Sequence, residues 1–139
     1  MKLVVVDTNA FLRFLLNDIP KQVEEFELLL NQAKKSEITL IIPQIIIFEL
    51  NFTLIKYYLL PKDEVIKKLQ SIIKTPYFKI QDIEIFREAI KLYSGSSNLS
   101  FADCFVYYSS EFWKAQLFTF DKNLAKLTSI ESKIRRLKV

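Results

Sequence analysis

Hydrophobic and polar positions divide the chain into short apolar runs that alternate with longer segments of helical spacing. The run from Leu3 to Val6 is β-branched and shows no alternation, which is typical of a strand covered on both faces. Residues 38–42 have the same character. Further strands are predicted at residues 77–80, 117–120 and 134–139.

The segments between these runs carry apolar residues at helical intervals. Pro20, Pro43 and Pro61 each suit the first turn of a helix, while Asp82 and Ser100 are candidate N-caps. The expected helices cover residues 10–16, 20–35, 43–59, a segment beginning at residue 61, and residues 82–95, 100–113 and 121–127.

Strands that alternate with helices favour an α/β fold. Right-handed crossovers then give a mainly parallel sheet with helices on both faces, a three-layer α/β/α sandwich. No repeat, low-complexity run or linker interrupts the pattern, so we expect a single domain over residues 1–139.

Composition excludes several kinds of site. The chain has no histidine, which excludes a Ser-His-Asp triad and a ribonuclease that uses imidazole groups. A single glycine, Gly95, excludes P-loops and dinucleotide-binding turns. One cysteine, Cys104, fits a reducing cytosol, and we expect a soluble cytoplasmic protein with no membrane span. The net charge of +4 suits a polyanionic partner.

Acidic residues stand alone in otherwise uncharged stretches. Asp7 is the only charged residue between Lys2 and Arg13, and Glu49 and Asp103 are isolated in the same way. An unpaired carboxylate in apolar surroundings needs a partner such as a capping amide, a cation or a metal ion.

The positions of these acids converge on one end of the predicted sheet. Asp7 and Asp121 directly follow predicted strands, and ligands of open parallel sheets bind beyond the carboxyl ends of the strands. Glu49 lies two turns into the helix after the second strand, and Asp103 lies in the first turn of the helix opened by Ser100. Oxygen ligands without nitrogen or sulfur favour Mg²⁺ or Mn²⁺.

Each acid also has a purely structural interpretation. Asp7 and Asp121 could only cap the helices that follow them, and Asp103 could only interact with its helix N-terminus. Glu49 could pair with Lys56, seven residues further along the same helix face. The coincidence of four such residues favours a shared site.

These residues lie in four ordered motifs that resemble the PIN-domain nucleases, particularly the VapC-type toxins of toxin–antitoxin pairs. The motifs are VVVDTN at residues 4–9, IIPQIIIFEL at 41–50, LSFADCFV at 99–106 and LFTFDKNL at 117–124. The resemblance covers nearly the whole chain. Cys104 departs from it, because a small alanine is more usual there.

The resemblance implies catalytic and metal-binding roles for Asp7, Glu49, Asp103 and Asp121. It also implies assistance from Thr8, Asn9 and Thr119, and a mainly parallel sheet of about five strands. The implied activity is hydrolysis of RNA by metal-activated water, with Mg²⁺ or Mn²⁺ as cofactor. Candidate contacts to the RNA backbone are Lys2, Arg13, Lys122 and Lys126.

As partners, the resemblance implies RNA, a small antitoxin protein and a second copy in a homodimer. The alternative is a PIN scaffold with weak catalysis that binds RNA or protein. Two other enzyme classes with a strand ending in aspartate fit poorly. Haloacid-dehalogenase-type phosphatases need a second aspartate where Asn9 stands, and response-regulator receivers need an acid beside Asp7.

Overall fold

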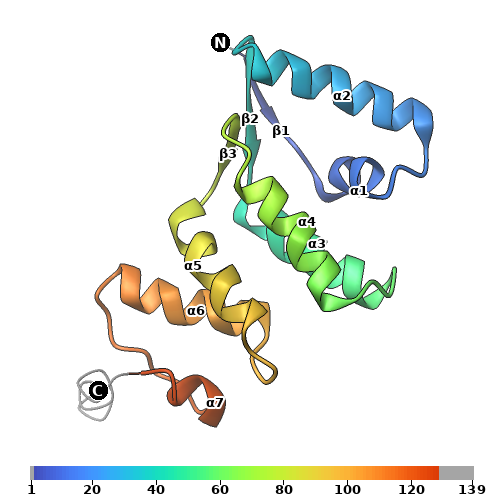
Figure 1. The fold of residues 1–139 in the computed structure, drawn as a ribbon. Coiled ribbons are helices and arrows are strands. Elements are labelled where there is room, and N and C mark those ends of the chain that lie inside the picture. The colour runs from blue at the N-terminus through green and yellow to red at the C-terminus, as the bar shows by residue number, and fades with distance from the viewer. Residues whose placement is uncertain (1, 129–139) are drawn as a thin grey trace. The chain divides into compact units, whose positions relative to one another are not determined.

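The computed structural model of the chain describes residues 2–128 (Figure 1). Its internal contacts divide the chain into two compact units, Met1–Ile83 and Glu84–Val139, and each unit is described by itself. The first unit contains Asp7 and Glu49, and the second contains Asp103 and Asp121. Each unit thus supplies two of the four predicted site residues.

A parallel sheet forms the centre of the first unit. Its strands are β1 (Lys2–Val5), β2 (Ile38–Ile42) and β3 (Phe78–Ile80), in the order β1-β2-β3. Lys2 lies opposite Ile38 in the register of β1 and β2. All the carboxyl ends of the strands therefore point the same way, with β2 in the middle (Figure 1).

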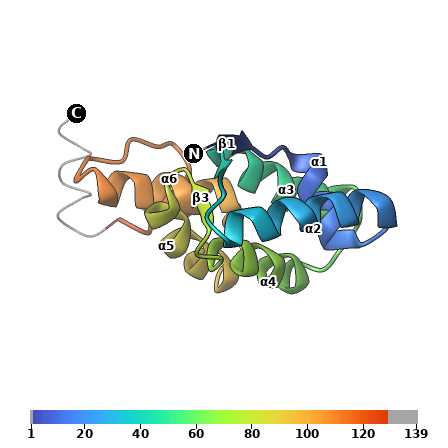
Figure 2. The same ribbon diagram turned by 90° about the horizontal axis from the view of Figure 1, so that it is seen from above.

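Four helices pack around this sheet: α1 (Thr8–Leu16), α2 (Pro20–Lys34), α3 (Gln44–Lys56) and α4 (Lys62–Ile73). The helix α2 contacts β2, α4 contacts β3, and α1 contacts both α2 and α3. The turn from α1 to α2 begins at Asn17, whose left-handed backbone (φ 51°) ends α1. Figure 2 shows α1 beside α2, as in Figure 1.

The core of the first unit is aliphatic with an aromatic corner. Phe11 contacts Phe26 and Phe78 edge to face, with ring centroids 5.3 and 5.6 Å apart. The aliphatic residues that expose none of their surface are Leu40, Ile42, Ile47, Leu50, Leu54, Val65 and Leu69. Burying one such side chain stabilises the fold by about 1.5–3 kcal/mol. The inner face of α3 is therefore firmly anchored.

The second unit is helical in its described part and consists of α5 (Ile83–Ser94), α6 (Phe101–Phe112) and the short α7 (Lys122–Ala125). The Phe86 ring of α5 lies 4.7 Å from that of Phe105 in α6, and Tyr93 stacks on Phe101 at 5.1 Å. Cys104 is fully buried in this aromatic core.

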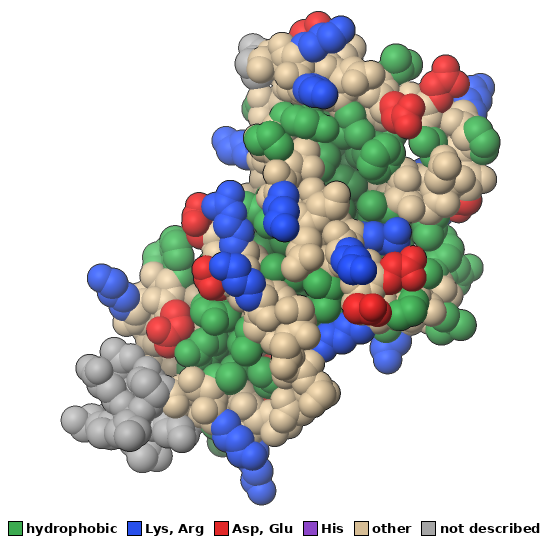
Figure 3. All heavy atoms as spheres, in the orientation of Figure 1, with side chains coloured by type: hydrophobic (Ala, Val, Ile, Leu, Met, Phe, Trp, Pro, Cys, Tyr) green, Lys and Arg blue, Asp and Glu red, His purple; other side chains and the backbone are tan. Residues whose placement is uncertain are grey.

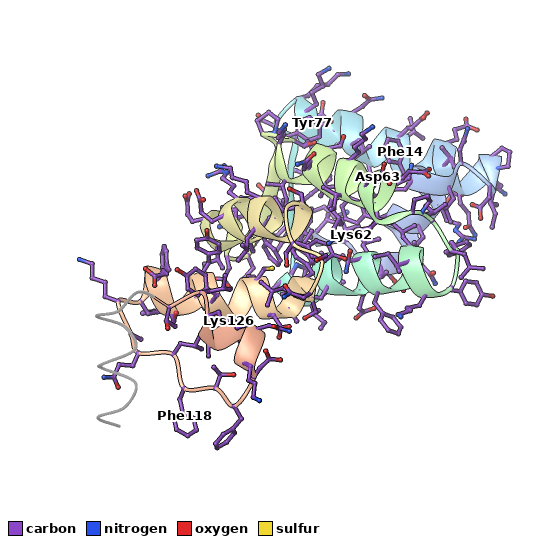
Figure 4. The ribbon with its side chains drawn as sticks, turned by 60° about the horizontal axis from the view of Figure 1, so that its bottom comes forward. Phe14, Lys62, Asp63, Tyr77, Phe118 and Lys126 are labelled. Atoms are coloured by element: carbon purple, nitrogen blue, oxygen red, sulfur yellow. The ribbon has the colours of Figure 1, made fainter. Side chains whose placement is uncertain are left out.

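The α/β class, the parallel sheet and the predicted helices are confirmed. The described sheet has three strands, however, and not about five. Residues 117–120 do not form the predicted strand, because no backbone hydrogen bond joins them to a neighbouring strand in the described chain. Phe118 and Phe120 instead expose 63% and 92% of their surfaces, and Phe118 points away from the ribbon in Figure 4. The strand predicted at residues 134–139 lies outside the described residues.

The prediction that β1 is covered on both faces was also wrong. Leu3 and Val5, on one face of the strand, expose 65% and 64% of their surfaces, whereas Val6 is buried. An apolar run without polar residues at alternate positions shows that both faces of the strand carry β-branched side chains. It does not show whether another element covers each face.

No described helix is long and apolar enough to cross a membrane. The longest, α2, has 15 residues and is amphipathic, whereas a membrane span needs about 20 apolar ones. The apolar stretch Ile38–Leu60 divides into β2 and α3, as predicted. On the face drawn in Figure 3, charged side chains of both signs are interspersed with hydrophobic ones.

Candidate active site

Asp7 lies directly beyond the carboxyl end of β1. The preceding Val6 is 3% exposed and its N–H donates to the Ile41 carbonyl at 3.1 Å, which fixes the chain against β2 up to this point. Asp7 is the N-cap of α1, and its Oδ1 accepts from the Ala10 N–H at 3.1 Å. The predicted cap is therefore formed. No described residue donates to its other oxygen, Oδ2.

Glu49 projects from the exposed side of α3, because Ile47 and Leu50 beside it are fully buried. Its Oε2 accepts a hydrogen bond from the Thr8 hydroxyl at 2.9 Å, across 41 residues of sequence. The structure thus brings the first and second motifs together. The assisting role that the resemblance implied for Thr8 stays a prediction.

Asp103 and Ser100 form a reciprocal capping box at the start of α6. The Ser100 Oγ accepts from the Asp103 N–H at 3.0 Å, and Asp103 Oδ2 accepts from the Ser100 N–H at 3.2 Å. These two bonds satisfy amide groups that have no partner within the helix. The carboxylate is held in one orientation, and no described group donates to its Oδ1.

Asp121 is the N-cap of α7. Its Oδ1 accepts from the Leu124 N–H at 2.9 Å, and its own N–H donates to the Thr119 hydroxyl at 3.0 Å. Thr119 therefore braces the backbone of Asp121. Residues 119–124 build a compact turn around the carboxylate from local bonds alone.

None of the four carboxylates has a basic partner among residues 2–128. Ion pairs between described side chains join Arg13 to Asp18, Arg87 to Glu84 and Lys91 to Glu88, and none of them involves the four candidate acids. In particular, Glu49 does not pair with Lys56. The three aspartates each commit one oxygen to a cap and leave the other available for a cation.

The donor set fits Mg²⁺ or Mn²⁺, because every candidate ligand is a carboxylate, hydroxyl or amide oxygen. The single thiol, Cys104, is fully buried in the core of the second unit. Among residues 2–128, no group of three or more acidic or cysteine side chains lies close enough together to hold a metal ion. The four-carboxylate metal site therefore stays a prediction.

The predicted RNA contacts differ in how strongly other residues hold them. Arg13 pairs with Asp18 at 3.3 Å and donates from Nη2 to the Tyr58 hydroxyl at 3.1 Å, with 19% of its side chain exposed. Arg13 therefore links α1 to the end of α3 and is not a free cation. Lys2, Lys122 and Lys126 are exposed and take part in none of the ion pairs between described side chains.

Asn9 and Arg13 also line an open cavity of about 560 Å³ between α1 and α2. Its other polar lining residues are Gln22 and Glu25, and Phe26 lies among the apolar ones. Asn9 is thus adjacent in sequence to the Thr8–Glu49 contact but lines a different surface of α1.

The capping of the N-terminus of α3 was not predicted from the sequence. The helix α3 follows Pro43 and has no side-chain cap of its own. The Gln81 Oε1, beyond the end of β3, accepts from the Gln44 N–H at 2.9 Å, and the Gln44 Nε2 donates to Asp82 Oδ2 at 2.6 Å. Asp82 thus contacts α3, and its predicted capping of α5 stays a prediction. The missing Ser, Thr, Asp or Asn before α3 was the only signal in the sequence.

Comparison with protein families decides the relationship. A family described as PIN domain matches residues 4–129, which include all four motifs. The chain belongs to the PIN domain family. A comparison with curated proteins finds no matching relative. PIN domains are generally nucleases and usually use divalent metal ions, so a nuclease that cleaves phosphodiester bonds is the activity that the family membership supports.

Proposed function

We propose that this PIN domain is a metal-dependent endoribonuclease in which Asp7, Glu49, Asp103 and Asp121 together bind Mg²⁺ or Mn²⁺. The observation that carries the proposal is the state of these carboxylates. They have no ion-pair partner among the described residues, and three of them keep one oxygen beyond the cap that orients them. Acids held in ion pairs would not share this pattern, and membership of the PIN domain family, whose members usually use divalent metal ions, favours a ligand role over capping alone.

The protein's own groups hold and orient the acids. The Thr8 hydroxyl fixes Oε2 of Glu49, and the amide of Ala10 fixes Oδ1 of Asp7. A divalent ion bound by these oxygens would lower the pKa of a bound water and neutralise charge on the scissile phosphate. Lys2, Lys122 and Lys126 would hold neighbouring phosphates of the RNA.

The decisive experiment measures cleavage of single-stranded RNA in Mg²⁺ or Mn²⁺ and again in excess chelator. Asp7→Asn, Glu49→Gln, Asp103→Asn and Asp121→Asn should each abolish turnover. The matched control is Asp63→Asn, which alters an exposed acid in the first turn of α4 that is outside the set (Figure 4). Activity that survives in chelator, or in any of the four variants, contradicts the proposal.

A separate measurement tests whether the four carboxylates bind metal at one shared site. Titration calorimetry with Mn²⁺ should show weaker binding for each of the four substitutions and unchanged binding for Asp63→Asn. If only the Asp7 and Glu49 variants lose affinity, Asp103 and Asp121 are caps and not ligands. Metal binding without turnover would favour the alternative, a scaffold that binds RNA or protein.

The products test the chemistry. Attack by metal-activated water expels the 3′-oxygen and leaves a 5′-phosphate and a 3′-hydroxyl, whereas attack by the RNA 2′-hydroxyl leaves a cyclic phosphate. An RNA with one 2′-deoxy sugar at the cleavage position should still be cut. A cyclic or 3′-phosphate end would contradict the mechanism.

We further propose that the chain is the cytoplasmic toxin of a type II toxin–antitoxin system, a homodimer inhibited by a small antitoxin protein. The support is the resemblance of its four motifs to VapC-type toxins. Co-expression with the small protein encoded next to it should suppress growth arrest and yield a stable complex. If the two proteins never co-purify, the toxin assignment fails while the nuclease proposal stands.

A further inference from the structure

The outer face of α3 carries an exposed row of unlike side chains. Ile45, Glu49, Phe52 and Lys56 follow one another at intervals of four, three and four residues, which places them on one side of a helix. Ile45 and Phe52 expose 55% and 64% of their surfaces, and Glu49 and Lys56 are also exposed. The opposite side of α3 is fixed in the core, so the row is held rigidly.

Packing of the core does not explain why Phe52 lies on this face. It lies one turn beyond Glu49, and no aromatic ring contact within the described chain involves it. The core of α3 is complete without it, because Ile47, Leu50 and Leu54 are fully buried. A large exposed ring next to a candidate catalytic acid is suited to contact a ligand.

Lys56 provides charge complementarity with an anionic ligand. It takes part in none of the ion pairs between described side chains, and Phe52 lies between it and Glu49 on the face. At 1.5 Å of rise per residue, Glu49 and Lys56 stand about 10 Å apart along the helix axis. The row therefore offers a cation-binding acid, an aromatic ring and a positive charge in sequence.

We propose that this face binds a single-stranded segment of the RNA substrate, with an unpaired base stacked on Phe52 and a phosphate next to Lys56. The inference rests on the proposed ribonuclease function and adds to it a residue that selects unpaired RNA. A base in a duplex is already stacked on its neighbours, whereas an unpaired base can lie on an aromatic ring.

The test measures binding separately from cleavage. Wild-type protein and variants are titrated, in chelator, into a single-stranded RNA that carries 2-aminopurine, whose fluorescence is quenched by stacking. Phe52→Leu keeps an apolar side chain but removes the ring, and should weaken binding about 5- to 150-fold and abolish the quenching. Phe52→Tyr should restore both. Lys56→Gln should weaken binding and lower the salt dependence of log Kd by about 0.7.

Tyr57→Leu is the matched control, since Tyr57 is an aromatic residue at the end of α3, 77% exposed and off this face. Its affinity should equal that of the wild type. Wild-type affinity and quenching in Phe52→Leu would overturn the proposal. The proposal would also be overturned if Phe52→Leu changed the sedimentation coefficient, and hence the oligomeric state, but left the affinity for RNA unchanged. That result would show that this face joins two copies of the chain. The binding titration is run in chelator, so it does not depend on metal-dependent cleavage. A protein that binds this RNA through Phe52 but does not cleave RNA in Mg²⁺ would therefore contradict the proposed ribonuclease function and leave this inference standing.

Discussion

Substitution of Ser100 and Asp103 one at a time separates the stability of α6 from catalysis. The two residues exchange hydrogen bonds of 3.0 and 3.2 Å at the start of the helix. Ser100→Ala removes the hydroxyl that accepts from the Asp103 N–H but keeps the carboxylate and its bond from the Ser100 backbone. Asp103→Asn removes the negative charge but keeps a side-chain oxygen that can accept the same bond.

The magnitudes follow from these contacts. Loss of an N-cap serine costs about 1 kcal/mol, within a range of about 0.5–2 kcal/mol. Loss of the charge alone costs about 0.3–1 kcal/mol, the usual interaction of an acid with a helix N-terminus. Ser100→Ala should therefore lower the melting temperature by about 3–6 °C, and Asp103→Asn by no more than that. If Asp103 is a metal ligand, only Asp103→Asn should abolish turnover.

The assay combines urea unfolding in chelator with RNA cleavage in Mg²⁺ at a temperature at which all variants are folded. The expected result is a less stable but active Ser100→Ala variant and a nearly wild-type but inactive Asp103→Asn variant. Wild-type turnover in Asp103→Asn would show that the carboxylate is only a cap. Loss of turnover in both variants would show that the hydroxyl is needed to orient the carboxylate.

Three further predictions concern the whole chain. Saturating Mg²⁺ at about 100 times its Kd should stabilise the fold by about 2.7 kcal/mol, and a melting temperature that does not respond to Mg²⁺ would argue against binding. Leu54→Ala should cost about 2–5 kcal/mol in urea unfolding because Leu54 is fully buried, whereas the control Leu28→Ala, at a position 61% exposed, should stay within about 0.5 kcal/mol. Burial raises the pKa of Tyr107 and of Tyr108 above 10.0, so unfolded tyrosines lose protons first and stability should fall as pH rises above 10. Replacing both with phenylalanine should flatten that fall, and an unchanged slope would assign it to other groups.

The sequence determined the features that depend on neighbouring residues. Apolar runs located all three described strands, and Pro20 and Ser100 marked the starts of α2 and α6. Caps at Asp7 and Asp121 were predictable because a cap involves residues within one helical turn. The same local rule could not show whether the second oxygen of each aspartate binds a metal ion, because that depends on groups distant in sequence.

Only the tertiary structure decided the pairings between distant segments. The bond from Thr8 to Glu49 spans 41 residues, and the trans cap from Gln81 to α3 spans 37. Neither leaves a periodic pattern, because each depends on where the sheet places the ends of β1, β2 and β3. A strand also needs a neighbour to accept its hydrogen bonds, so the apolar run 117–120 could not become one through its composition alone. Short-range preferences therefore set the elements, and the path of the chain set which of their side chains meet.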